Sequence, residues 1–365
     1  MNFKKILLSL LILITLLFQC GCDIIIPTAA LDKEPAESQT SLLKVHFLDV
    51  GQGDSTFIEL PNGETMLIDA AEKSESDKIV TYIFSQGYDT INYVIATHPH
   101  SDHIGGIPDI LNNFIVDNFY MTSADNDTSV YQDMLDAIVK NGAVSHISAA
   151  EDIIIDQPDL SAEIVAPKTT ECDNLNDTSI VLKLSYKENV FLFTGDAEKY
   201  EEDNIWTNIK CDVLKVGHHG SSTSTSKNFL KKTEPEYAVI SCGLYNSYGH
   251  PADKTLSALA DKEIKTYQTD LQGTIVFTSD GENITVDKNP VKYASTSESS
   301  TISSSSTPLS PTTTEYILNI NTKRIHYPSC DSVKKTKDEN KKITNDYESA
   351  ISEGYKPCAI CNPTG

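Results

Sequence analysis

One short segment constrains the fold of this chain more than any other. It reads THPHSDH at residues 97–103 and directly follows the apolar run YVIA at 93–96. An apolar run before a polar cluster predicts a buried strand that ends at a site. Three imidazoles and one carboxylate within six positions suit a borderline metal such as zinc. The order lets His98 and His100 hold one metal while Asp102 and His103 hold a second. The alternative is a loop of solvated residues.

Four further motifs accompany this cluster: FLDVGQGDS at 47–55, LID at 67–69, FTGD at 193–196 and KVGHHGS at 215–221. Together they resemble the metallo-β-lactamase superfamily, and within it the hydrolase domain of the competence protein ComEC and its stand-alone secreted relatives. The match covers residues 43–288 in the family's order. The resemblance implies an α/β fold, the αββα sandwich, with two divalent metals, zinc or manganese, in its site.

The resemblance also assigns residues from distant parts of the chain to this site. It implies that Asp196 bridges the two metals, with an N-cap of a helix at 197–206 as the alternative, and Gly195 lets the backbone turn close to the metals. One residue of the pair His218 and His219 completes the second metal's shell, and we favour His219, while the other contacts substrate or donates a proton. His250 is a last ligand or a general acid, with a plain surface-loop histidine as the alternative.

Other residues are expected to support the site without completing the metal shells. Asp69 would orient the metal-binding loop, with a helix N-cap as the alternative. His146 is the only histidine between the cluster and Asp196, so it is the only histidine available as the superfamily's usual third ligand of the first metal. The relatives carry a motif like NDTS, here at 176–179, at this stage of the chain, so we expect Asn176 or Asp177 to face the metals instead.

Three polar residues of the opening motif, Asp49, Gln52 and Asp54, are expected to shape their loop or to lie near substrate. Asp102 and the paired histidines would accept and donate protons during the reaction.

Two adjacent cations would lower the pKa of a bridging water and hold a phosphodiester during in-line attack. Phosphodiester cleavage, above all of DNA, is implied by the ComEC resemblance and not by the spacing. The net charge of −23 excludes a globally basic surface, so metals and a local patch must hold any anionic substrate. A cell-wall phosphodiester or phosphorylcholine ester is the alternative substrate. A catalytically idle surface binding protein is the alternative class, and the complete set of ligands argues against it.

The N-terminus has the pattern of a secretory leader. Lys4 and Lys5 precede an apolar run at 6–18, which is shorter than the roughly 20 residues of a spanning helix. Gly21-Cys22 resembles a bacterial lipoprotein cleavage site, which implies a lipid on Cys22 and a place on the extracytoplasmic face of the membrane. Gln19 departs from the usual leucine, and simple secretion or an uncleaved anchor is the alternative. Residues 1–22 would form the signal peptide and 23–42 a tether.

The C-terminal part is expected to form a second module. Residues 289–314, rich in Ser, Thr and Pro, predict a linker that cannot bury a core. In the module at 315–365, His326, Cys330, Cys358 and Cys361 give the count of a closed structural zinc site. Residues 319–363 resemble the small Ada-type zinc-binding domain, whose partner here would be DNA or a cell-surface molecule. A disulfide between the last two cysteines is the alternative.

The hydrophobic pattern between the motifs alternates between strand and helix periods. Helices are expected at 76–86, 107–114, 131–141, 197–206 and 252–260. Strands are expected at 44–50, 55–60, 65–69, 93–96, 119–121, 144–147, 179–184, 190–194, 212–216, 236–241, 265–267, 273–277 and 283–286. The remaining thiols, Cys172, Cys211 and Cys242, fit no ligand spacing and are expected to be inert.

Overall fold

The computed structural model describes residues 41–293, 316–328, 330, 333, 336–337 and 340–358. The expected signal peptide with Cys22, nearly all of the tether, most of the linker and Cys361 lie outside these residues. Within the described ranges, none of the helices has the length and apolar character needed to cross a membrane.

The first sheet has eight strands in the order β15-β14-β1-β2-β3-β4-β5-β6. The strands β1, β2 and β3 form an antiparallel meander, and β3 to β6 run parallel because helices connect them. In sheet order the strands span Ile284–Val286, Ile275–Ser279, Leu43–Phe47, Thr56–Glu59, Thr65–Ile68, Thr90–Ile95, Ile115–Met121 and Val144–Ile147.

The second sheet has seven strands in the order β13-β12-β11-β10-β9-β8-β7, parallel from β10 to β13 and antiparallel from β7 to β10. They span Lys265–Gln268, Tyr237–Ile240, Val213–Lys215, Asn189–Phe193, Val181–Tyr186, Leu160–Ala166 and Ile153–Gln157. The sequence patterns did not predict β7 and β8. At the sheet edge β7 leaves Ile153 61% exposed, so its apolar residues do not alternate between buried and exposed positions.

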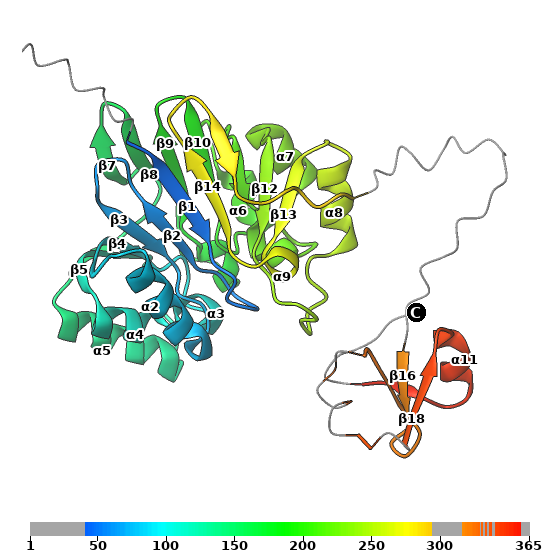
Figure 1. Ribbon diagram of the computed structural model, residues 1–365. Helices are drawn as coiled ribbons and strands as arrows, with labels where there is room; N and C mark the ends of the chain where they lie inside the picture. Colours follow the sequence, from blue (N-terminus) through cyan, green and yellow to red (C-terminus); the bar gives the residue numbers. More distant parts are fainter. Residues whose placement is uncertain are drawn as a thin grey trace, which may run out of the picture. The chain divides into compact units, whose positions relative to one another are not determined.

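Helices pack on the outer face of each sheet, which gives four layers (Figure 1). The helices α2, α4 and α5 cover the first sheet and α6, α7 and α8 the second. They span Ser76–Ser85, Ile107–Asn113, Ser129–Asn141, Lys199–Asn204, Lys227–Thr233 and Asp253–Ala260. Shorter turns lie in the loops: η1 at Lys73–Glu75, α3 at Ser101–Ile104, η2 at Leu175–Thr178, η3 at Gly217–Gly220 and α9 at Thr269–Gln272. The predicted αββα sandwich is confirmed.

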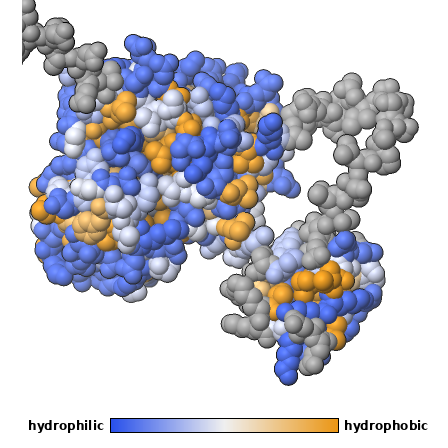
Figure 2. All heavy atoms as spheres, in the orientation of Figure 1, coloured by the Kyte–Doolittle hydropathy of each residue, from blue (hydrophilic) through white to orange (hydrophobic). Residues whose placement is uncertain are grey.

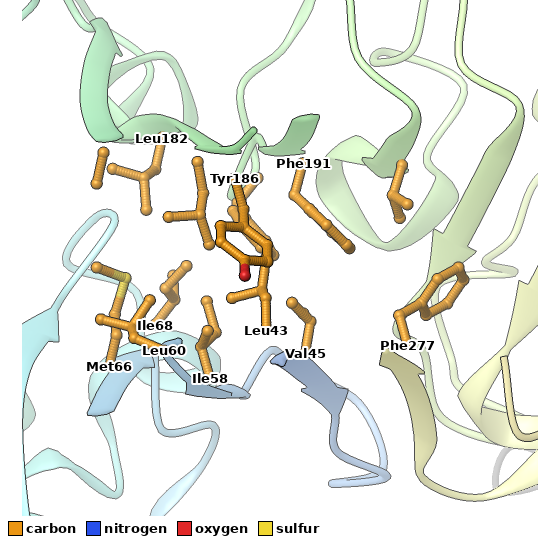
Figure 3. Packing of buried hydrophobic residues seen from close by; sticks show 14 of the residues in the cluster. Leu43, Val45, Ile58, Leu60, Met66, Ile68, Leu182, Tyr186, Phe191 and Phe277 are labelled. Carbon is orange, nitrogen blue, oxygen red and sulfur yellow. The ribbon is translucent and has the colours of Figure 1, made fainter. Parts of the chain in front are cut away.

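The main core lies between the two sheets, where alternate residues of each strand face inward. Leu43, Val45 and Phe47 of β1 are fully buried, and Figure 3 shows the first two facing Tyr186 and Phe191 of the second sheet. Burial of such a side chain contributes roughly 1.5–3 kcal/mol. The outer face of the sandwich in Figure 2 is mostly hydrophilic, with apolar residues scattered between polar ones.

The topology brings the motifs to one edge of the sandwich. The strands β3, β4 and β5 are parallel neighbours, and so are β10, β11 and β12. Asp69 and His98 therefore follow adjacent strand ends in the first sheet. Asp196, His218 and the loop at 243–252 follow adjacent strand ends in the second. Ligands bind at this edge in open α/β sheets because loops from several strands meet there.

The described part of the C-terminal module is a small sheet in the order β18-β16-β17-β19, with one helix, α11. These elements span Lys341–Thr344, Tyr316–Asn319, Arg324–His326, Lys356–Pro357 and Tyr347–Ser352. A core of its own forms around Leu318, Ile325 and Tyr355.

Candidate metal centre

Asp69 fixes the loop that carries the histidine cluster. Its carboxylate accepts hydrogen bonds from the Thr97 backbone N–H at 2.8 Å and from the Thr97 hydroxyl at 2.7 Å. The same carboxylate lies 2.8 Å from Nδ1 of His103. Asp69 is buried and has a left-handed backbone with φ of 58°. A carboxylate on one ring nitrogen turns the other nitrogen toward a metal, which is the supporting role that the sequence predicted.

One group of candidate ligands consists of Asp102, His103, Asp196 and His219. Nε2 of His219 lies 3.3 Å from the Asp102 carboxylate and 3.4 Å from that of Asp196. Nε2 of His103 lies 3.2 Å from the other Asp196 oxygen. Tetrahedral ligands held at about 2.1 Å from zinc are about 3.4 Å apart, so these atoms could share one metal.

A second group consists of His98 and His100. Nε2 of His98 and Nδ1 of His100 are 2.9 Å apart, and Nε2 of His98 is 4.0 Å from the Asp196 carboxylate. Asp196 thus lies within 4.0 Å of ligand atoms from both groups, a position from which a carboxylate could bridge two metals. Gly195 makes this position accessible. It has φ of +49°, and a Cβ atom there would lie 3.0 Å from the Thr97 side chain.

Buried polar atoms show that the site fits metal ions. Within the described part of the chain, Nε2 of His103, Nε2 of His219 and Oδ1 of Asp196 make no hydrogen bond, although opposing ligand atoms lie 3.2–3.4 Å away. A buried polar atom without a partner costs about 1–3 kcal/mol. Imidazole nitrogens and carboxylate oxygens this close together form a set of ligand atoms that suits zinc or manganese.

The electrostatics of the cluster favour cations. Burial raises the pKa of Asp196, but the positive charges on His219 and His103 outweigh it and hold that pKa well below its usual range. Burial lowers the pKa of His103 and His219, yet the surrounding carboxylates, Asp196 first, raise both well above their usual values. Divalent metals could supply the same positive charge in place of the ring protons.

The pair His218 and His219 lies in a strained turn that separates the two side chains. Both have left-handed backbones, with φ of 48° and 53°. Such a conformation costs about 1–3 kcal/mol per non-glycine residue and persists mainly at functional sites. His219 is 1% exposed and faces Asp102 and Asp196. His218 is half-buried, with Nδ1 3.1 Å from the Glu198 carboxylate and Nε2 3.7 Å from that of Asp196. This arrangement agrees with the preference for His219 as the ligand.

The candidate ligands open on a cavity of about 320 Å³. Its walls include Gln52, Asn176, His218, Tyr248 and His250. The His250 ring lies 5.3 Å from the His218 ring, centre to centre. Burial first, and then the charges of His218 and His219, lower the pKa of His250 to about 4. His250 is therefore neutral at pH 7, as either a metal ligand or a proton acceptor must be.

Asn176 is the residue of the NDTS motif that reaches the cavity. Its Nδ2 donates to Glu198 at 3.1 Å, and its buried Oδ1 has no hydrogen-bond partner among the described residues. Asp177 instead accepts hydrogen bonds from the backbone N–H groups of Glu198 and Glu201. His146 is not at the site. It bonds to Asn118 at 3.1 Å and stacks on Tyr120.

Comparison with known proteins gives the family. The model of the metallo-beta-lactamase superfamily matches residues 48–244, more than half of the chain. The chain belongs to the metallo-β-lactamase superfamily. The αββα sandwich and the strand-end position of its histidine motif agree with this membership, which gives the chain a metal-dependent hydrolase fold.

Three curated relatives place this superfamily member near competence proteins. ComE operon protein 3 of Bacillus subtilis is 29% identical over 64% of this chain and 33% of its own length. Recombination protein 2 of Haemophilus influenzae is 32% identical over 57% and 25%. Competence protein ComA of Neisseria gonorrhoeae is 28% identical over 63% and 31%. The chain thus spans a quarter to a third of these relatives. Among solved structures, the metallo-beta-lactamase fold protein YhfI of Bacillus subtilis aligns with a TM-score of 0.43 and 11% identity, over 62% of this chain and 95% of its own.

Sequence reasoning missed a buried ion pair beneath the metallo-β-lactamase site. The Lys215 ammonium pairs with the carboxylate of Asp54, and the two side chains are 3% and 6% exposed. The other Asp54 oxygen lies 3.3 Å from Nδ1 of His219. Nδ1 of His219 itself is hydrogen-bonded to the backbone carbonyl of Ser241 at 3.0 Å, so Asp54 acts on this ring through its nearby charge. Asp49 lies outside the site and contacts Lys78 at 3.7 Å. The signal available was a lone lysine at the end of a strand of buried residues.

The C-terminal module contains a separate cluster. Ligand atoms of His326, Cys330 and Cys358 all lie within 4.8 Å of one another, and the three residues are buried. The fourth predicted ligand, Cys361, lies outside the described residues. In the sandwich, burial raises the pKa of Cys242 to about 12 and also raises the pKa values of Cys172 and Cys211. This agrees with the expectation of inert thiols.

Proposed function

We propose that the sandwich is a two-metal hydrolase that cleaves phosphodiester bonds. The position of Asp196 carries this proposal, because its carboxylate lies 3.2–3.4 Å from Nε2 of His103 and His219 and 4.0 Å from Nε2 of His98. Such a carboxylate can bridge cations about 3.5–4 Å apart. Bound metals would supply the positive charge that polarises the phosphoryl oxygens and acidifies a water molecule.

The proposed ligands form two sets that share Asp196. His98 and His100 belong to the first set, in which Asn176 is the residue best placed to assist through its Oδ1. Asp102, His103 and His219 belong to the second. Asp69 holds the ring of His103 through its Nδ1, and the Ser241 backbone carbonyl holds the ring of His219 in the same way, which leaves each Nε2 for a metal.

Residues of this chain would also move protons. Glu198 holds Nδ1 of His218, which leaves Nε2 in the cavity as the atom that takes up and returns a proton. His250 lies beside it, and because it is neutral at pH 7 it fits the role of a metal ligand or proton acceptor better than that of a general acid. Asp102 borders the same cavity and can accept a proton from the attacking water.

DNA is the substrate that we favour. Two relatives are described as a recombination protein and a competence protein, which supports DNA as the substrate. The net charge of −23 means that metals and cavity residues must supply the affinity for phosphate. A phosphorylcholine or other cell-wall phosphodiester is the alternative substrate, and an idle scaffold is the alternative class.

The test is hydrolysis by the chain lacking residues 1–22, loaded with zinc or manganese. Substrates are linear and circular DNA, RNA, cyclic dinucleotides, bis-p-nitrophenyl phosphate and p-nitrophenylphosphorylcholine. We expect cleavage of DNA and of the simple diester, loss with a chelator, and recovery on return of the metal. Preferential cleavage of the choline ester would give the alternative substrate. Metal-loaded protein that cleaves none of them would support the idle scaffold.

We further propose that Cys22 carries a lipid on the extracytoplasmic face of the membrane, because the leader stops at Gly21-Cys22. We expect Cys22→Ala to release the protein from the membrane fraction, measured by fractionation and immunoblot. Continued membrane association with an intact leader would identify an uncleaved anchor instead.

The C-terminal cluster is proposed as a structural zinc site. Cys361 would supply the fourth ligand beside His326, Cys330 and Cys358. The module would then offer a folded surface to DNA or to a cell-surface partner.

A further inference from the structure

The loop after β12 carries a solvent-exposed aromatic ring at the wall of the cavity. Tyr248 lines the cavity and is 68% exposed. A tyrosine gains stability mainly when its ring is removed from water, so an exposed ring in a fixed loop adds little to folding. An exposed ring beside a candidate reaction centre is instead available to a substrate.

Asn246 fixes the backbone that carries this ring. Its Oδ1 accepts from the backbone N–H groups of Tyr248 and His250, both at 3.1 Å. Its Nδ2 donates to the carbonyls of Gly243 at 2.9 Å and His250 at 2.5 Å. The N–H of Gly243 in turn donates to the Gln52 side chain at 3.1 Å. The loop is thus held at both ends, and little entropy remains to be lost when a ligand contacts the ring.

The ring forms a flat platform. Its plane lies 23° from that of the His250 ring, with centres 5.7 Å apart. The large exposed fraction of Tyr248 leaves room for a second planar group on this stack. A nucleobase is such a group, and stacking on aromatic side chains is how proteins hold single strands without reading sequence. Bases inside a duplex cover one another and cannot reach the ring.

A quaternary ammonium group prefers a different arrangement. Recognition of choline uses aromatic cages, in which several ring faces surround the cation. Among the described residues that line this cavity, Tyr248 is the one tyrosine, and Phe and Trp are absent. The other rings are four histidines, all of which belong to the proposed metal and proton machinery. One flat platform favours a base over a choline headgroup.

We propose that Tyr248 stacks on a base of a single-stranded nucleic acid and so positions the neighbouring phosphodiester at the metals. This inference rests on the proposed function and adds the strand state of the substrate and the residue that holds it. Phosphate then binds through the metals, and the base supplies affinity that the acidic chain cannot gain from surface charge.

The test compares Tyr248→Ala with Tyr248→Trp. The control is Tyr200→Ala, since Tyr200 is a tyrosine 53% exposed on α6 that does not line the cavity. Binding of a labelled short oligodeoxythymidylate to the full, metal-chelated chain is measured by fluorescence anisotropy, so that hydrolysis plays no part. KM and kcat are then measured with metal on the oligonucleotide and on methyl p-nitrophenyl phosphate, a diester without a base.

We expect Tyr248→Ala to weaken oligonucleotide binding about 5- to 150-fold, which corresponds to the loss of one stacked base. KM for the oligonucleotide should rise by a similar factor, with little change on the small diester. Tyr248→Trp should retain binding, and Tyr200→Ala should match wild type.

Equal binding by the two alanine variants would overturn the inference. So would a loss of turnover by Tyr248→Ala that is confined to p-nitrophenylphosphorylcholine, because it would assign the ring to a choline headgroup. If binding depended on Tyr248 but none of the proteins cleaved a phosphodiester, the stacking site would stand and the proposed hydrolase would fail.

Discussion

Replacing Lys215 by methionine removes one partner of the buried ion pair beneath the metal centre. Methionine is nearly as long as lysine, so the side chain still fills the space at the end of β11, but the charge is lost. The Asp54 carboxylate then remains 6% exposed without its ammonium partner. His219, at 3.3 Å, and His103, at 4.0 Å, stay close to it.

The expected magnitude follows from this burial. Removing one partner of a buried ion pair costs about 3–5 kcal/mol, because an uncompensated charge remains away from water. We expect Lys215→Met to lower the free energy of unfolding by about that amount. Asp54→Asn should cost a similar amount, since it leaves a buried ammonium. The double variant should lose much less than the sum of the two, because neither charge remains.

The assay is urea unfolding followed by circular dichroism in the presence of a chelator, because bound metal would stabilise the native state by mass action. A matched control is Lys265→Met. Lys265 lies on β13 of the same sheet and pairs with Glu236 at 2.6 Å, but the two side chains are 49% and 56% exposed. A surface pair contributes about 0–1 kcal/mol, so this control should change stability little.

Metal affinity gives a second measurement on the same variants. Asp54 places a negative charge 3.3 Å from Nδ1 of His219, and loss of such a supporting carboxylate typically lowers metal affinity about 10- to 100-fold. We expect that loss for Asp54→Asn in competition with a metal-binding dye. Two results would refute the buried ion pair. One is a loss of unfolding free energy by Lys215→Met no larger than that by Lys265→Met. The other is a loss in the double variant equal to the sum of the two single losses.

Three further results are expected. Asp196→Asn should lower turnover at least about 100-fold, or roughly 2.7 kcal/mol of barrier, with lower metal content but an unchanged circular dichroism spectrum; wild-type turnover would remove its bridging role. Cys358→Ser, or truncation after Thr314, should remove one zinc by elemental analysis and spare turnover on a soluble diester; a truncated chain without metal would refute the sandwich ligands. A hydrogen bond from His46, which outweighs burial, lowers the pKa of Glu59 from 4.5 to about 2. Its carboxylate therefore stabilises the fold above pH 4.5, so Glu59→Gln should cost at most about 3 kcal/mol at pH 7, and this difference should shrink as pH falls toward 2 in urea unfolding; a constant difference would refute it.

Much of the fold could be predicted because its signals are local. The apolar run before His98 predicts β4, and the positions of Asp196 and His218 after two further apolar runs predict strand ends in the same way. Spacing within the motif at 98–103 is set by a few backbone bonds, so the sequence alone predicts that its four candidate ligands lie near one another. In the structure His98 and His103 cluster with Asp196. The edge strand β7 was missed because its burial does not follow a strict period of two.

Tertiary structure alone decided how the separate motifs meet. The register of β10, β11 and β12 brings Asp196, His219 and the Tyr248 loop to one cavity. The spacing of these residues along the chain does not predict that register. The ion pair of Asp54 and Lys215 joins a loop after the first strand to the end of β11. The energy of this ion pair depends on its burial by both sheets. In the sequence, the two residues are only two charges far apart along the chain. Local backbone geometry thus set which residues could bind metals, and packing between distant segments set which of them face one another.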